Sequence, residues 1–106
     1  MGIYILLSKL TPYGRKTLKE RPHRIREVDK ELENRGVKVI DQFATLGQYD
    51  FVNIVDAPDN ETIGEVSVDL CARGTVDIIT LPAIPVDSLI DLFKNGKIEK
   101  QKVENT

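Results

Sequence analysis

The first apolar segment of the chain is continuous rather than alternating. Ile3 to Leu7 is apolar at every position, which predicts a strand with two apolar faces. The pattern then becomes helical, because Thr11 can cap a helix and Pro12 suits its first turn. We expect this helix to run only to about Lys19, since Pro22 lacks an N–H and disfavours helical geometry just before it.

A longer amphipathic helix is predicted from Pro22 to about Asn34. Ile25, Val28 and Leu32 recur at steps of three and four residues, so they form one apolar stripe. Gly36 follows as a helix stop.

Two strands joined by a short turn come next. The segments are Val37 to Leu46 and Phe51 to Val55, and residues 47–50 form the turn of a predicted hairpin. A regular alternation in the first of these strands places Val39 and Phe43 on the same face.

The remainder of the chain predicts a helix, a strand and a short last helix. Pro58 and Asp59 begin the helix, whose buried stripe is Ile63, Val66 and Leu70, and Gly74 ends it; the strand is Val76 to Leu81. After Pro82 and Pro85 the last helix presents Val86, Leu89, Ile90 and Phe93 before Gly96.

The order of these elements is βαββαβ with a terminal helix, which predicts an α+β, ferredoxin-like fold. We expect one domain over residues 1–96 and a polar tail over residues 97–106. In this fold both helices cover one face of the sheet. The segments Ile3 to Leu7 and Phe51 to Val55 are too apolar for the other face to stay in water, so we expect two sheets to pair in a homodimer or a multiple of it.

Composition narrows the class of protein. The 106 residues include one cysteine and no tryptophan, with 41% hydrophobic and 30% charged residues, as in a globular chain. No apolar run approaches the roughly 20 residues of a membrane span, and no signal peptide pattern begins the chain. Cys71 has no partner for an internal disulfide, so a cytoplasmic location is expected.

The charge is unevenly distributed. Residues 9–38 carry ten basic and five acidic side chains, whereas residues 39–93 carry one basic and ten acidic ones. The cluster from Arg15 to Arg26 is interpreted as a solvated helix face, with an anionic ligand or nucleic acid as alternatives. We expect no nucleic-acid binding, because the body is acidic and lacks the stacking aromatics of an RNA-recognition sheet.

The stretch from Leu46 to Asp59, with its Gly-x-Tyr-Asp sequence at Gly47, Tyr49 and Asp50, resembles the signature of the GYD family. The resemblance extends over roughly residues 3–93. It implies a dimeric α/β barrel, in which two such sheets close together. The effector-binding domains of leucine-responsive transcription regulators are similar and bind amino acids between subunits, but this chain lacks their DNA-binding helices.

The Gly-x-Tyr-Asp residues have a structural and a functional interpretation. Gly47 permits a positive φ in a tight turn, and the Asp50 carboxylate can accept hydrogen bonds from turn amides. The same hairpin could instead border a pocket, with the Tyr49 hydroxyl and Asp50 as polar anchors.

Asn53 is the most specific candidate for ligand binding. If the helices cover Val52 and Ile54, Asn53 lies inside the paired sheets, where a buried amide needs partners. These could be Thr80, Tyr4, water or a ligand.

No motif indicates a metal or a cofactor. His23 is the only histidine, and one histidine makes no metal site without carboxylate help; we interpret it as an exposed residue at a helix start, with proton transfer as the alternative. No nucleotide-binding glycine pattern, phosphate loop or catalytic triad is found. We expect no cofactor, and Cys71 is interpreted as a packed side chain.

Three classes of function remain from the sequence. The first is an oligomeric small-ligand-binding or interaction module with a pocket between the paired sheets. The second is a cofactor-free or haem-linked monooxygenase of the dimeric α/β-barrel class, although this chain lacks the tryptophan of the haem-degrading proteins. The third is a purely structural oligomer.

Overall fold

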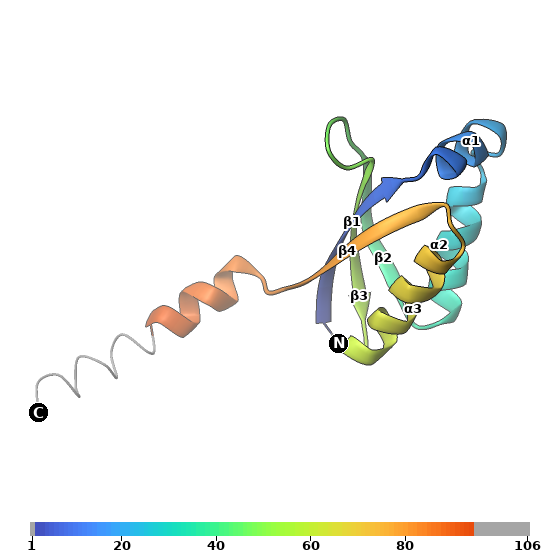
Figure 1. The fold of residues 1–106 in the computed structure, drawn as a ribbon. Coiled ribbons are helices and arrows are strands. Elements are labelled where there is room, and N and C mark those ends of the chain that lie inside the picture. Colours follow the sequence, from blue (N-terminus) through green and yellow to red (C-terminus); the bar gives the residue numbers. More distant parts are fainter. Residues whose placement is uncertain (1, 95–106) are drawn as a thin grey trace, which may run out of the picture.

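A computed structural model describes residues 2–94 of the chain (Figure 1). The elements are β1 (Gly2–Leu10), α1 (Pro12–Glu20), α2 (Arg24–Asn34), β2 (Lys38–Ala44), β3 (Phe51–Ala57), α3 (Asn60–Ala72) and β4 (Val76–Ala83). Residues 86–94 form a further helix, here called the terminal helix. The predicted stop at Gly96 and the polar tail lie outside the described residues.

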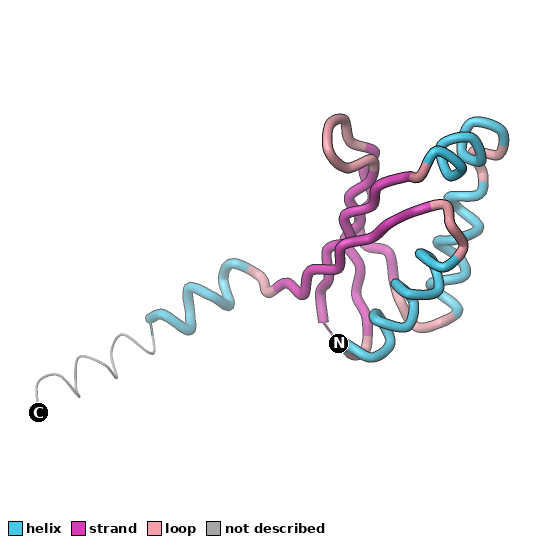
Figure 2. The backbone as a smooth tube through the Cα atoms, in the orientation of Figure 1, coloured by secondary structure: helices cyan, strands magenta, loops and turns pink. Residues whose placement is uncertain are grey.

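The four strands form one antiparallel sheet in the order β2-β3-β1-β4. The helices α1, α2 and α3 all lie on one side of it (Figure 2). This confirms the predicted ferredoxin-like α+β fold. The terminal helix continues beyond β4 and extends away from the sheet (Figure 1).

Capping residues set the starts of two helices. Thr11 Oγ1 accepts a hydrogen bond from the Gly14 amide at 3.0 Å, and Asp59 Oδ1 accepts one from the Thr62 amide at 2.8 Å. The hydrogen bonds to Thr62 lower the pKa of Asp59. By contrast, α2 begins at Arg24, two residues after the predicted start, because Pro22 and His23 form a turn.

The core lies between the helices and the sheet. Its buried members are Tyr4, Leu6, Leu32, Val37, Val55, Ala57, Ile63, Val66 and Leu70. They alternate along β1 and β3, as expected for side chains on one face of a strand. The predicted stripe of α3 is confirmed, since Ile63, Val66 and Leu70 are all buried.

The strand β2 contains a bulge that the sequence did not indicate. Val39 is opposite Val55 and Asp41 is opposite Ile54, so Ile40 is the extra residue. One extra residue exchanges the two faces for the remainder of the strand. The prediction that Val39 and Phe43 share a face is therefore wrong, and Phe43 lies on the side without helices.

The strand β4 continues through Pro82 to Ala83, beyond its predicted end. Proline cannot donate a ladder hydrogen bond, but β4 pairs only with β1 and is an edge strand. The strand thus leads directly to the terminal helix, where the amides of Ser88 and Leu89 donate to the Pro85 carbonyl at 3.0 and 3.3 Å.

The start of α1 rests directly on the start of β4. The Thr11 amide donates to the Thr75 carbonyl at 3.0 Å, and its hydroxyl donates to the Gly74 carbonyl at 2.7 Å. Gly14 is buried against the same backbone, where a Cβ atom would come within 1.8 Å of the Thr75 oxygen. This contact requires a residue without a side chain.

Candidate functional site

The sheet presents an apolar surface on the side that α1, α2 and α3 leave uncovered, here called the open face. The strand pairing places eight large apolar side chains on it, namely Ile3, Ile5, Leu7, Phe43, Val52, Ile54, Ile79 and Leu81. The side chains nearest the sheet edges are the most exposed, with Phe43 at 55% and Ile79 at 47%. All four strands contribute, so this is one continuous patch.

Charged residues border the open face at its ends and along the edge strand β2, where Asp41 is opposite Ile54. Lys9 is opposite Asp77 where β1 meets β4, and Lys38 is opposite Asp56 where β2 meets β3. The Asp56 Oδ1 atom is buried and has no hydrogen-bond partner within residues 2–94. An apolar centre with a polar rim is the arrangement of a protein–protein interface.

The terminal helix is the second exposed apolar surface. Its apolar members, Val86, Leu89, Ile90, Leu92 and Phe93, are all 42–71% exposed. At 3.6 residues per turn they occupy one half of the helix. The polar members, Asp87, Ser88, Asp91 and Lys94, occupy the other half. The predicted helix is thus present and amphipathic, and its apolar half faces solvent in the single chain.

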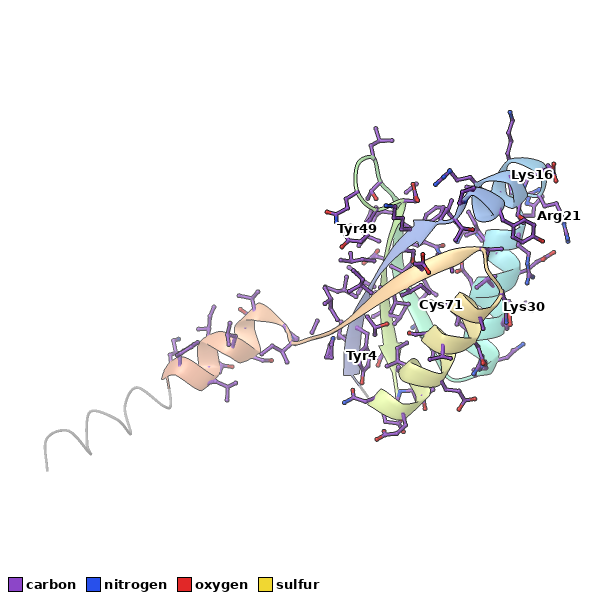
Figure 3. All side chains as sticks on the ribbon, in the orientation of Figure 1. Tyr4, Lys16, Arg21, Lys30, Tyr49 and Cys71 are labelled. Carbon is purple, nitrogen blue, oxygen red and sulfur yellow. The ribbon has the colours of Figure 1, made fainter. Side chains whose placement is uncertain are left out.

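The Gly-x-Tyr-Asp residues fasten the β2–β3 loop to the end of β1. Gly47 has φ of 111°, in the region that favours glycine. The Asp50 carboxylate accepts a hydrogen bond from the Leu10 amide at 2.7 Å, rather than from an amide of its own turn. The Tyr49 carbonyl accepts one from the Thr45 hydroxyl at 2.7 Å, and Tyr49 lies at the base of this loop (Figure 3).

Asn53 lies on the helix-covered face and not in the interior of paired sheets. It is opposite Leu6 on β1 and has the same orientation as Val55, which is fully buried beneath the helices. Val52 and Ile54 therefore point to the open face, the reverse of the arrangement that the prediction considered. Because β3 is apolar on both faces, its sequence could not decide between the two orientations.

Tyr4 and Thr80 also lie on the helix-covered face, where both contact α3 or its start. The Tyr4 hydroxyl donates to Asn60 Oδ1, and Thr80 Oγ1 lies 2.8 Å from the hydroxyl of Ser67. Tyr4 is only 5% exposed. These groups fasten α3 to the sheet, so the structure does not bring them together with Tyr49 and Asp50 around one pocket.

The basic cluster forms local pairs on the outer surface. Arg24 pairs with Glu27 at 2.9 Å, and Arg26 pairs with Asp29 at 3.1 Å, each three residues along α2. His23 is exposed beside them. Exposed pairs of this kind stabilise a fold only slightly, so the pattern is typical of a solvated helix face.

Phe43 could not be recognised as a residue of the open face from the sequence pattern, since only the bulge turns it to that side. Within residues 2–94 no cluster of three or more histidine, cysteine, aspartate and glutamate side chains is arranged to hold a metal ion. Among the helices of residues 2–94, none combines the length and the apolar character of a membrane-spanning segment.

The topology defines the class of protein as a ferredoxin-like α+β domain with one uncovered sheet face. Within that class, the family model of the GYD domain matches residues 4–93, and the chain belongs to this family. A protein of Thermus thermophilus is 48% identical over 95 residues, which cover 89% of this chain and 100% of that protein. It is named glutamine synthetase and cystathionine beta-lyase binding protein. No solved structure matches the chain significantly.

Proposed function

We propose that this protein is a dimeric interaction module that binds metabolic enzymes, with glutamine synthetase as the first candidate. The similarity to the Thermus protein carries the proposal, because it covers the whole length of a relative named for binding two enzymes. The two exposed apolar surfaces supply the means of binding. In this proposal the open face binds a second copy of the chain, and the terminal helix binds the enzyme.

Self-association through the open face accounts for its composition. Eight apolar side chains gathered from four strands would form a large exposed patch on a monomer. A two-fold pairing brings the same surface of both copies together, so one sequence supplies both halves of the interface. The pairing also offers the Asp56 carboxylate a donor from the second copy, such as Lys9 or Lys38 at the rim.

The terminal helix has the pattern of a groove-binding peptide. Val86, Leu89, Ile90 and Phe93 are spaced at i, i+3, i+4 and i+7, the positions from which an amphipathic helix anchors in an apolar groove of its partner. The helix extends away from the sheet, where a partner can reach it (Figure 1). Aromatic and aliphatic anchors of this kind provide most of the binding energy in an interface.

This arrangement moves the expected small-ligand pocket away from the paired sheets. Asn53, Tyr4 and Thr80 lie on the helix-covered face, so they could not line a pocket between two open faces. The proposal keeps the cytoplasm as the location, on the basis of the free thiol of Cys71.

Binding to immobilised Thermus thermophilus glutamine synthetase, followed by surface plasmon resonance, tests the proposal. We expect the protein to bind, and we expect Leu89→Glu to weaken binding by at least about tenfold, because it places a carboxylate among the apolar anchors. Ser88→Glu is the matched control, since it adds the same carboxylate to the polar half of the same helix.

The two variants test whether the terminal helix is the docking element, and the unchanged protein tests whether the enzymes are bound at all. Equal binding by both would exclude the terminal helix as the docking element. No binding of the unchanged protein to glutamine synthetase or to cystathionine beta-lyase would overturn the proposed function.

A further inference from the structure

The space between the helices and the sheet is packed at one end and hollow at the other. The core surrounds the Tyr4–Val55 pair. Toward Ser8 and Leu10, a cavity of about 340 Å³ lies between α1, the first half of α2 and the sheet. Protein interiors contain few voids larger than a water molecule. This volume is instead at the lower end of the roughly 300–1,000 Å³ typical of ligand pockets.

The walls of the cavity are mainly apolar. Leu18, Ile25 and Val28 line it from the helices, and Phe51, Val76 and Ile78 line it from the sheet. All six are partly buried, and Val28, Val76 and Ile78 also pack against the core. The exposed lining residues Tyr13, Arg21 and Arg73 mark its mouth. A ligand body that fits these walls is apolar.

Asn53 supplies an unmatched acceptor in the sheet wall. Its Oδ1 atom is buried and has no hydrogen-bond partner among the described residues. The neighbouring amide of Gln42 donates to Asp29 at 3.0 Å and accepts from Arg26 at 3.1 Å, and no hydrogen bond joins it to Asn53 Oδ1. An unpaired buried acceptor costs about 1–3 kcal/mol. The site therefore favours a ligand with a hydroxyl or N–H donor at its inner end.

Among the described residues, one positive charge at the mouth of the cavity is unpaired. Three guanidinium groups, from Arg21, Arg24 and Arg73, and one carboxylate, that of Asp29, belong to the lining. Arg24 is paired with Glu27 at 2.9 Å and Arg73 with Glu31. Asp29 already accepts hydrogen bonds from Arg26 and Gln42. Arg21 has no ion pair within residues 2–94. Guanidinium groups bind carboxylates through paired N–H donors, so the mouth favours an anionic end.

We propose that this cavity binds a small carboxylic acid with an apolar body and a hydrogen-bond donor at the end remote from the carboxylate. The carboxylate lies at the guanidinium group of Arg21, the body lies between α1, α2 and the sheet, and the donor reaches Asn53 Oδ1. The site is complete within one subunit, and it does not depend on the proposed enzyme binding.

Three matched probes test each part of the ligand separately: 4-hydroxyphenylacetate, phenylacetate and 4-hydroxyphenylacetamide. The first has all three features, the second lacks the donor and the third lacks the charge. We expect 4-hydroxyphenylacetate to bind with a Kd of about 1 mM or lower. Each of the other two should bind about tenfold more weakly, the effect of one lost hydrogen bond or ion pair. Backbone ¹⁵N–¹H spectra of the full chain measure the affinity and identify the amides that shift.

Two variants connect the affinity to the residues. Arg21→Gln replaces an exposed side chain with another polar one. It should weaken the binding of 4-hydroxyphenylacetate about tenfold and leave the affinity for 4-hydroxyphenylacetamide unchanged. Asn53→Leu removes the unmatched acceptor, so it should raise the melting temperature of the free protein and abolish the preference for the hydroxyl group. Lys9→Gln is the control, because it removes a positive charge from the opposite face of the sheet.

The opposite results overturn the proposal. These are equal affinity for the three probes, no binding of any probe at about 1 mM, or shifted amides on the open face instead of around Asn53 and Arg21. A lower melting temperature of Asn53→Leu with unchanged selectivity would assign Asn53 to the scaffold.

Discussion

At the residue scale, the buried glycine of α1 controls how closely that helix approaches the sheet. Gly14 has no space for a Cβ atom, which would meet the Thr75 carbonyl oxygen at 1.8 Å. We expect Gly14→Ala to force α1 away from β4 and to lower the free energy of unfolding by about 1–3 kcal/mol, as in other overpacked sites. Urea unfolding followed by circular dichroism measures the change.

A second helical glycine provides the control for this prediction. Gly64 lies in α3, and a Cβ atom there would meet nothing within 4 Å. Gly64→Ala should therefore stabilise the protein by about 0.5–1 kcal/mol through helix propensity alone. If both variants shifted stability in the same direction, close packing at Gly14 would not be the cause.

At the scale of elements, an ion pair connects α2 with the end of α3. Arg73 donates to both carboxylate oxygens of Glu31, at 3.0 Å to Oε2, and these hydrogen bonds lower the pKa of Glu31 below its ordinary value of 4.5. A lowered folded-state pKa stabilises the fold above the unfolded-state pKa. The contribution is lost as pH falls below 4.5 through the folded-state value.

The variant Glu31→Gln tests this pH dependence. We expect it to be less stable than the unchanged protein at neutral pH, and we expect the difference to shrink as pH falls below 4.5. Urea midpoints across this range measure it. Glu33→Gln, an exposed change on the same helix, should leave the pH dependence as it is. A constant difference for Glu31→Gln at every pH would contradict the pairing.

Most helices and strands of this chain could be predicted from the sequence. Capping residues, prolines and apolar periodicity predicted every helix and strand of residues 2–94, because these signals are local. They did not determine which face of β3 meets the helices, since Asn53 is the one polar residue between Phe51 and Val55. Three features depend on contacts between distant segments, which no local pattern encodes. They are the bulge at Ile40, the cavity, and the close approach of α1 to the Thr75 backbone at Gly14.

At the scale of the whole molecule, the open face is the surface through which we propose that two copies of the chain pair. We expect light scattering coupled to size exclusion to give a mass of twice 11.9 kDa, or a multiple of that, at micromolar concentration. Phe43→Lys should yield monomers, because it buries a charge within a paired interface. Val68→Lys is the matched control, since Val68 is 69% exposed on α3. A monomer of the unchanged protein would contradict sheet pairing.

The bulge at Ile40 also affects the border of the sheet. An edge strand offers unpaired N–H and C=O groups on which another chain can extend the sheet, the route to fibrils. The strand β2 is such an edge, and its extra residue interrupts the regular spacing of these groups between Val39 and Asp41. The interruption therefore disfavours the addition of further strands along this edge of the sheet.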